Sequence, residues 1–340
     1  MSFTHNFDCS LHPYANLVLL PVAVLLSIWV ITNITKRWMR TRKQHSQPAQ
    51  AEIAPLEKAP LIEPLGDFDW KTAQRRQLRP FKPTYHITMA IQANTPSELI
   101  TIDEDYLERI SHRRSIIANH GATVHGCIPE GDAAVRELYT HLLSEYLPAR
   151  FPTIFQLSRD NSMCENLVTG KLFPTLPEGN TETALRILGE TVEEDLFLLQ
   201  ETPEGHRSVA FMCCFPSGFD PSTKLGKTLV EIHAPVPSYE KIGNSMEKFF
   251  AKLDVGKSVK RTNWSVQTHM ELFNCKGNHI TGDDAYVDNE DVDIENIKEE
   301  GLGAAFADAI EGLSKGNAPG MWTYKSAVRW GSSVIGYLRS

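Results

Sequence analysis

The pattern of hydrophobic and polar residues first shows a long apolar run near the N-terminus. Residues 17–34 read LVLLPVAVLLSIWVITNI and carry no charge. About 20 residues at a rise of 1.5 Å each span the hydrocarbon core of a bilayer. The pattern therefore predicts one transmembrane helix over residues 17–35, slightly short, preceded by a tail of residues 1–16.

The charges beside this run predict its orientation. Asp8 is the charged residue of the N-terminal flank, whereas five basic residues crowd the C-terminal flank: Lys36, Arg37, Arg40, Arg42 and Lys43. The positive-inside rule then places residues 1–16 in a lumen or outside the cell and the rest of the chain in the cytosol, in a membrane that the sequence does not name. A cleaved signal peptide is the alternative, but its basic residues would precede the apolar run.

A polar stretch follows the predicted anchor. Residues 44–64 read QHSQPAQAEIAPLEKAPLIEP, and this mixture of Pro, Ala, Gln and Glu has few large apolar side chains. Such a composition stays extended and solvated. We therefore interpret residues 36–65 as a basic flank and a disordered linker, with a folded domain from residue 66.

Beyond the linker, strand and helix patterns alternate irregularly. Residues 81–91 (FKPTYHITMAI) have the character of a strand, and residues 195–201 and 207–215 flank a turn as in an antiparallel hairpin. Within the predicted domain, helices are expected at four places. Asp103 would cap the first, which has a stripe of Leu107, Ile110, Arg114 and Ile117, and the second would cover residues 133–146 before Pro148. The third would cover residues 181–190, and Ser238 would cap the fourth, which carries Ile242, Met246, Phe249, Phe250 and Leu253. This mixture predicts an α+β fold with an antiparallel sheet.

Composition excludes several classes of protein. Hydrophobic residues make up 41% of the chain, which is enough to form a core, and the net charge of -8 argues against nucleic acid as a partner. The six cysteines show no CxxC spacing, so we expect reduced thiols instead of a zinc or iron–sulfur site.

Two stretches are more specific than any short motif: KLGKTLVEIHAPVP at residues 224–237 and NWS at residues 263–265. They occur in order with FKPTYHITMAI, YLERISHRR (106–114) and EEDLFLLQ (193–200). Taken together, the chain from Phe81 to about Phe273 resembles the alpha subunit of haem-dependent oxidative N-demethylases and its fungal, membrane-anchored relatives.

The resemblance implies both a fold and a reaction. The fold would be a PAS-like antiparallel sheet with flanking helices that holds haem b. The activity would be oxidation of a small methylated amine with release of formaldehyde, using electrons from a separate reductase with flavin and iron–sulfur components. A haem needs an axial ligand, an apolar slot and usually cations for its propionates.

His233 is the first candidate for the iron ligand, because it lies between a helix and a proline-rich loop in the most family-like stretch. The alternative is a buried histidine bonded to a backbone carbonyl. The remaining candidates are grouped by role: His86, His112 and His269 as reserve ligands; Lys224, Lys227, Lys260 and Arg261 for propionates or a phosphate.

The resemblance also implies a place in the pocket wall for Asn263 and Trp264. Trp264 is equally consistent with a plain core residue. The run Glu193, Glu194 and Asp195 offers carboxylates for an amine substrate, although solvation of a helix end explains it as well.

The chain departs from the family after the predicted domain of residues 66–275. The Arg/Glu/Arg/Gln run with the catalytic acid, which the resemblance implies there, is not found. Residues 276–340 are interpreted as an acidic loop and a divergent tail, with a weak helix expected over GLGAAFADAIEGLSKG (301–316). Two explanations stay open: a divergent protein without the catalytic acid, or a last part altered by splicing or gene prediction. The first leads to an alternative function, a noncatalytic haem-binding sensor or scaffold.

Overall fold

The computed structural model describes residues 61–75, 79, 81–216, 218–261, 264, 266, 272–275 and 292–340. The predicted tail (1–16), transmembrane helix (17–35) and most of the predicted linker lie outside these residues. In the part of the chain that is described, no helix combines the length and the apolar character needed to cross a bilayer.

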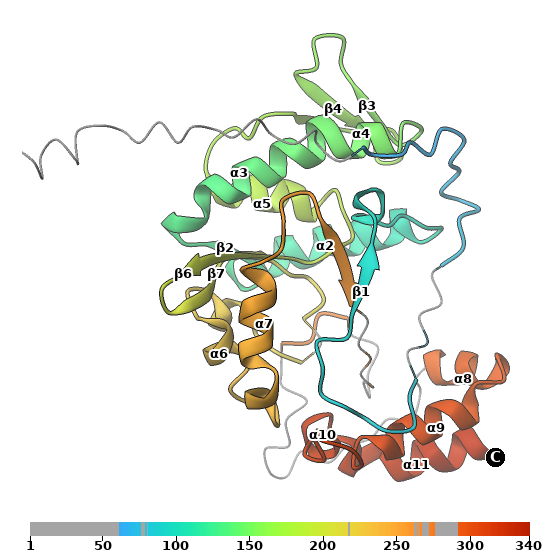
Figure 1. Ribbon diagram of the computed structural model, residues 1–340. Helices are drawn as coiled ribbons and strands as arrows, with labels where there is room; N and C mark the ends of the chain where they lie inside the picture. The colour runs from blue at the N-terminus through green and yellow to red at the C-terminus, as the bar shows by residue number, and fades with distance from the viewer. Residues whose placement is uncertain are drawn as a thin grey trace, which may run out of the picture. The chain divides into compact units, whose positions relative to one another are not determined.

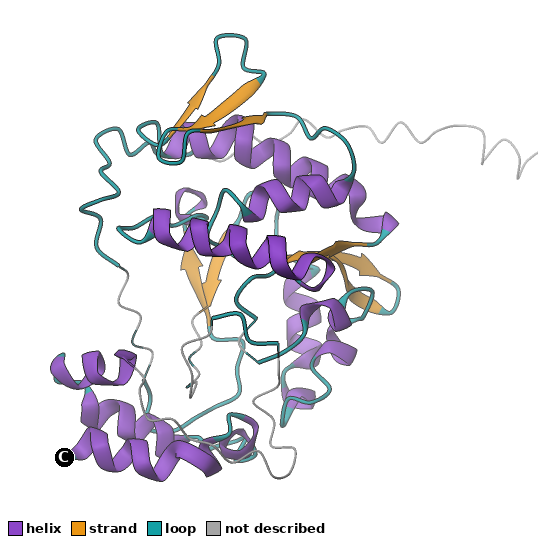
Figure 2. Cartoon of the chain, turned by 180° about the vertical axis from the view of Figure 1, so that it is seen from behind, coloured by secondary structure: helices purple, strands orange, loops and turns teal. Residues whose placement is uncertain are grey.

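Helices and strands mix along the chain, which confirms the α+β prediction (Figures 1 and 2). The helices are α2 (Tyr106–His120), α3 (Asp132–Thr140), α4 (Leu147–Arg150), α5 (Thr181–Gly189), α6 (Leu229–Ile232), α7 (Gly243–Phe250), α8 (Val292–Glu299), α9 (Gly303–Gly312), α10 (Met321–Tyr324) and α11 (Ala327–Arg339). The strands are β1 (Ile91–Asn94), β2 (His125–Cys127), β3 (Phe155–Leu157), β4 (Met163–Asn166), β5 (Lys171–Pro174), β6 (Leu196–Thr202), β7 (Gly205–Met212) and β8 (Ser258–Arg261).

The described strands pair in antiparallel fashion, as predicted, but they form three small sheets. Their orders are β1-β8, β2-β7-β6 and β3-β4-β5. The predicted hairpin is confirmed as β6 and β7, with a bulge between Leu198 and Leu199. The β3-β4-β5 meander was not predicted, because its strands of three or four residues are too short to show a clear alternation.

Helix α2 is confirmed, but its buried face is shifted from the predicted stripe. Tyr106, Ile110, Arg113 and Ile117 recur at helical spacing and are buried, whereas Leu107 is 40% exposed. Arg113, and not Arg114, therefore lies in the main core, where α2, α3 and α5 pack together with the sheet of β2, β6 and β7.

The predicted end of the next helix at Pro148 is wrong. A π-helical segment, His141–Tyr146, joins α3 to α4, and the Leu147 N–H bonds back to the carbonyl of Leu142. Pro148 then occupies the first turn of α4, where its missing N–H interrupts little. Helix α5 is confirmed, and the side chain of Asn180 caps it by accepting from Thr183 N–H.

The strand predicted over residues 81–91 is also wrong for most of its length. Only Ile91–Asn94 form β1, and Ala90 has a positive φ of 49° just before it. Two of the preceding N–H groups bond elsewhere: Tyr85 donates to the Gly312 carbonyl over 3.1 Å, and Ile87 donates to Asn317 Oδ1 over 2.7 Å. The segment is thus held by the C-terminal part of the chain and not by a sheet.

Ser238 does not cap a helix. Its φ is 63° and its side chain makes no capping bond, while α7 begins five residues later at Gly243. The end of the predicted acidic loop is helical as α8, and the expected weak helix is confirmed as α9. Helices α10 and α11 were not predicted.

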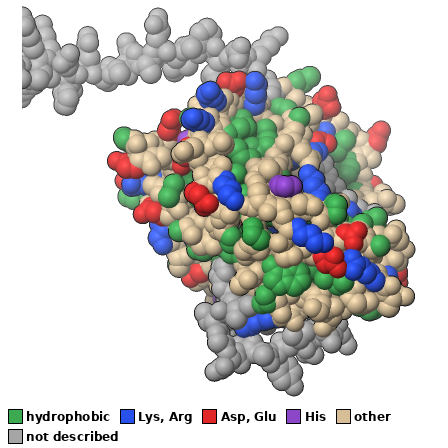
Figure 3. All heavy atoms as spheres, turned by 60° about the horizontal axis from the view of Figure 1, so that its bottom comes forward, with side chains coloured by type: hydrophobic (Ala, Val, Ile, Leu, Met, Phe, Trp, Pro, Cys, Tyr) green, Lys and Arg blue, Asp and Glu red, His purple; other side chains and the backbone are tan. Residues whose placement is uncertain are grey.

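The C-terminal helices build a second core. The buried members include Phe306, Ile310, Leu313, Met321 and Trp330, and Phe81 and Trp264 pack against them. The face turned forward in Figure 3 carries basic and acidic side chains interspersed, with hydrophobic side chains gathered between them. Charge of one sign therefore does not dominate that face.

Candidate functional site

His233 directly follows helix α6 and is fixed by two contacts. Its Nδ1 lies 2.8 Å from the Leu229 carbonyl, and its ring stacks on Tyr239 with centroids 4.8 Å apart and planes 5° from parallel. A carbonyl only accepts, so Nδ1 carries the hydrogen and Nε2 presents its lone pair. This tautomer leaves Nε2 able to bind a metal, and the same bond is the one that the alternative, a histidine bonded to a backbone carbonyl, predicts.

The surroundings of His233 keep it neutral. Burial lowers the pKa of its imidazole, and the nearby charges of Arg261 and Lys224 lower it further, against an opposing effect of the bond to Leu229. Burial likewise lowers the pKa of Lys224, whose Nζ lies 3.5 Å from the Ile232 carbonyl. One uncharged nitrogen donor therefore lies close to two cations.

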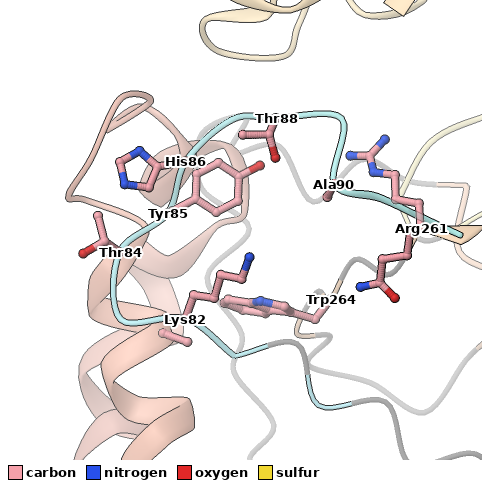
Figure 4. Close-up of a pocket in the computed structure, with 10 residues that line it drawn as sticks. Lys82, Thr84, Tyr85, His86, Thr88, Ala90, Arg261 and Trp264 are labelled. Carbon is pink, nitrogen blue, oxygen red and sulfur yellow. The ribbon is translucent and has the colours of Figure 1, made fainter. Parts of the chain in front are cut away.

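A pocket of about 120 Å³ is also lined by Arg261 (Figure 4). Its described lining comes from the segment before and including β1, from the end of β8 and from α9: Lys82, Thr84, Tyr85, His86, Thr88, Ala90, Gln92, Arg261, Trp264 and Ala309. In Figure 4 the side chains of Lys82, Tyr85, Thr88 and Arg261 surround one opening, and His86 lies on the outer side of its loop.

Trp264 contributes to both the pocket and the second core. Its ring meets Phe306 edge-on at a centroid distance of 5.2 Å, and the Lys325 ammonium lies 5.0 Å from its centroid. Lys325 also donates to the Trp264 carbonyl. Burial lowers the pKa of Lys325 to about 8, and Arg261 adds to the effect. Trp264 is thus a core residue that also contributes to the wall of this small pocket.

The pocket wall at residues 82–87 is positioned by the C-terminal helical region. A Cβ added at Gly312 would lie 2.8 Å from the carbonyl oxygen of Pro83, and one added at Gly316 would collide with the carbonyl of Tyr85. The chain therefore passes directly over these two glycines. This contact was not foreseen, because nothing in the local pattern of either segment indicates it.

The remaining ligand and cation candidates are scattered. Asn263 and His269 lie outside the described residues. His86 and His112 are exposed, and the His112 ring stacks against Phe215 with centroids 6.2 Å apart. Lys260 lies 3.7 Å from Glu98. Among the described candidates, then, the charges of Lys224 and Arg261 act on His233, and Lys227 lies beside Lys224. His86 and Trp264 line the pocket together with Arg261.

The predicted carboxylates lie elsewhere, at the start of β6, and two of them serve the fold. Asp195 accepts from Arg113 Nη1 at 2.7 Å and from the N–H groups of Cys214 and Phe215. Glu193 accepts from Arg109 Nη1 at 2.6 Å. Both carboxylates are thereby committed to holding α2 against the sheet.

Glu194, unlike Glu193 and Asp195, forms no ion pair within the described part of the chain. Its Oε1 accepts from the Thr101 N–H at 2.6 Å, while its buried Oε2 has no partner among the described residues. Burial raises the pKa of Glu194 to about 7. The folded state therefore holds this proton up to higher pH than the unfolded chain, whose carboxyl titrates near the ordinary value of 4.5.

We expect Glu194→Gln to stabilise the protein at high pH. Between pH 4.5 and 7 the folded state binds more protons than the unfolded state, so stability falls as the pH rises. In Glu194→Gln the uncharged amide removes this loss of stability, which is at most about 3 kcal/mol above pH 7. Below pH 4.5 the substitution changes the stability little. Thermal unfolding from pH 4 to 9 measures the difference. Glu204→Gln, in the exposed hairpin turn, is the control, and parallel curves for wild type and Glu194→Gln would contradict the assignment.

The geometry around His233 agrees with a comparison to known families. The family described as "Haem-dependent oxidative N-demethylase, alpha subunit-like" matches residues 90–298. The chain belongs to this family. The match includes His233, Lys224, Arg261 and Trp264, and it extends beyond the resemblance seen in the sequence into α8.

Membership of the N-demethylase-like family indicates a haem-dependent oxidative function and haem as the cofactor. No curated protein matches the chain. The donor set agrees with the indicated cofactor, since His233 offers a neutral nitrogen and the two neighbouring cations suit propionates. Sequence reasoning missed Tyr239 as the stacking partner and Lys82 and Tyr85 as pocket residues, because nothing in their sequence spacing distinguishes them.

Proposed function

We propose that this protein binds haem b through Nε2 of His233 and oxidises a small methylated amine, releasing formaldehyde. The observation that carries the proposal is the bond from His233 Nδ1 to the Leu229 carbonyl, which leaves Nε2 as the donor atom. The bound haem would supply the redox chemistry, with electrons from a separate flavin and iron–sulfur reductase. The family match supports the cofactor and the reaction class.

The chain's own residues have distinct parts in this proposal. Stacking on Tyr239 fixes the plane of the His233 ring. Lys224 would offer positive charge to a propionate. Trp264 and Asn263 belong to the pocket wall, as the family resemblance implies. The finer description of the fold as a PAS-like sheet belongs to the same proposal.

The full chain reconstituted with haem tests the proposal. Wild type is expected to show a Soret band, His233→Ala to lose it, and added imidazole to restore it partly. His112→Ala, an exposed histidine on α2, is the matched control and is expected to keep the band. A Soret band that survives in His233→Ala would contradict the ligand assignment.

Formaldehyde release from methylated amines, driven by a surrogate electron donor, then tests turnover. Haem binding without product favours the alternative function, a noncatalytic haem-binding sensor or scaffold. That alternative derives from the catalytic run expected after residue 275, which the sequence does not show.

We also propose that residues 17–35 anchor the chain in a membrane, with residues 1–16 lumenal or extracellular and the domain cytosolic. The uncharged run and its basic C-terminal flank support this orientation. In sealed vesicles with the cytosolic face outside, added protease is expected to digest the domain. Protection of the domain would contradict the orientation.

A further inference from the structure

The pocket beside Arg261 has a distinctive charge. Lys82 and Arg261 line it, and neither forms an ion pair within the part of the chain that the structure describes. No carboxylate is among the described lining residues. The described lining therefore carries two cations and no carboxylate, unlike the mixed surface seen in Figure 3.

The pocket also contains neutral hydrogen-bond donors. The hydroxyl groups of Tyr85 and Thr88 and the amide of Gln92 join the two cations in its lining. Figure 4 shows Tyr85 and Thr88 directed toward the same opening as Lys82. Two cations and several hydroxyl or amide donors around one space form a site for an oxyanion, such as a carboxylate or a phosphate.

The size of the pocket limits its ligand. A cavity needs roughly 10–15 Å³ to hold one water molecule, so about 120 Å³ accommodates on the order of ten non-hydrogen atoms. A tetrapyrrole is several times larger. The pocket thus suits a small ion beside the haem site and not the haem itself.

We propose that this pocket binds the carboxylate of a small organic ion. Resting on the proposed function, we infer that the methylated amine is an N-methyl amino acid and not a simple alkylamine. Arg261 and Lys82 pair with the carboxylate, and Tyr85 and Thr88 donate to it. The pocket segment also reaches the surroundings of His233, because Met89, between the lining residues Thr88 and Ala90, packs against the cluster of Leu229 and Tyr239 that holds His233.

The charge of the pocket explains why it should prefer an N-methyl amino acid to a simple alkylamine. At neutral pH a simple alkylamine is a cation without a carboxylate, and Lys82 and Arg261 repel it. Two unit charges about 4 Å apart interact by about 1 kcal/mol in water and about 4 kcal/mol at an effective dielectric constant of 20. Preference for the carboxylate-bearing ligand should therefore be at least about fivefold.

Calorimetric titration of the full chain, without haem and with haem bound, tests the inference. The probes are N-methylglycine, dimethylamine and inorganic phosphate. N-methylglycine is expected to bind at least about fivefold more tightly than dimethylamine. Arg261→Gln is expected to weaken the binding of N-methylglycine by a similar factor, with an unchanged unfolding temperature. Arg159→Gln, an exposed arginine between β3 and β4, is the matched control and is expected to bind like wild type.

Four outcomes would overturn the inference. Dimethylamine could bind as tightly as N-methylglycine, or Arg261→Gln could leave binding unchanged. Phosphate could bind more tightly than N-methylglycine, which would make the pocket a phosphate site. Haem loading could abolish the binding of N-methylglycine, which would assign the two cations to the propionates of haem.

The same titrations separate this inference from the proposed function. Binding of N-methylglycine that depends on Arg261, in a chain without a Soret band, would keep the carboxylate site and reject the haem assignment. A Soret band together with binding of dimethylamine alone would keep the haem assignment and reject the carboxylate site.

Discussion

Arg113→Met is expected to destabilise the protein by about 3–5 kcal/mol, the typical cost of breaking a buried ion pair. Arg113 is fully buried. Its guanidinium donates to the carbonyls of Gly189, Glu193 and Glu194 and to Asp195 Oδ1. The thioether replaces none of these bonds, so three carbonyls lose a donor and Asp195 keeps a poorly compensated charge.

Thermal unfolding measures the effect of Arg113→Met. A folded region of this size loses about 2–4 °C per kcal/mol, so a decrease of roughly 10 °C is expected. Arg186→Met is the matched control, because Arg186 is 45% exposed and pairs with Glu190 one helical turn away. Such surface pairs contribute about 0.3–0.5 kcal/mol. Equal decreases in the two variants would show that burial of Arg113 is not what matters.

Gly316→Ala is expected to loosen the pocket wall as well as the C-terminal helices. Gly316 has a φ of 86°, and an added Cβ would collide with the Tyr85 carbonyl. The left-handed conformation costs a non-glycine residue about 1–2 kcal/mol, and overpacking adds about 1–3 kcal/mol. The collision forces residues 84–86 away from the helices, so the pocket should widen and lose its ligand.

A second glycine separates the conformational cost of a positive φ from the effect of the collision. Gly301 has a similar φ of 74°, but nothing lies within 4 Å of an added Cβ. Gly301→Ala should therefore show only the conformational cost, about 1–2 kcal/mol, and leave ligand binding intact. Hydrogen exchange at Tyr85 and Ile87 and titration with N-methylglycine compare the two variants. Equal exchange and binding in both would contradict the role of the Gly316 contact.

Local sequence was sufficient where a segment is stabilised by its own neighbours. The hairpin of β6 and β7 and the helices α2, α5 and α9 followed from alternation, turn residues and helical spacing. The prediction for α2 was wrong only in its phase, because the stripe was started at Leu107 and not at the buried Tyr106, which placed Arg114 on it in place of Arg113. Arg113 is an exception because the distant carbonyls of Gly189, Glu193 and Glu194 satisfy its guanidinium.

Segments stabilised by remote partners were not predictable. Residues 81–90 have the composition of a strand, yet Tyr85 and Ile87 donate to groups more than 200 positions away along the chain. Within the candidate site, His233 and Trp264 were selected through the family resemblance. Lys82 and Tyr85 were not, because a pocket formed between remote segments leaves no periodic signal in either of them.

The origin of the pocket walls has an evolutionary consequence. The matched family range, residues 90–298, contains His233 and Arg261. Much of the opposite wall, from Lys82 to Thr88 and at Ala309, lies outside that range, as do the glycines that support it. The proposed iron ligand and Arg261 thus come from the part of the chain shared with the family, whereas the wall at residues 82–88 comes from outside it. We therefore expect relatives to differ most at that wall.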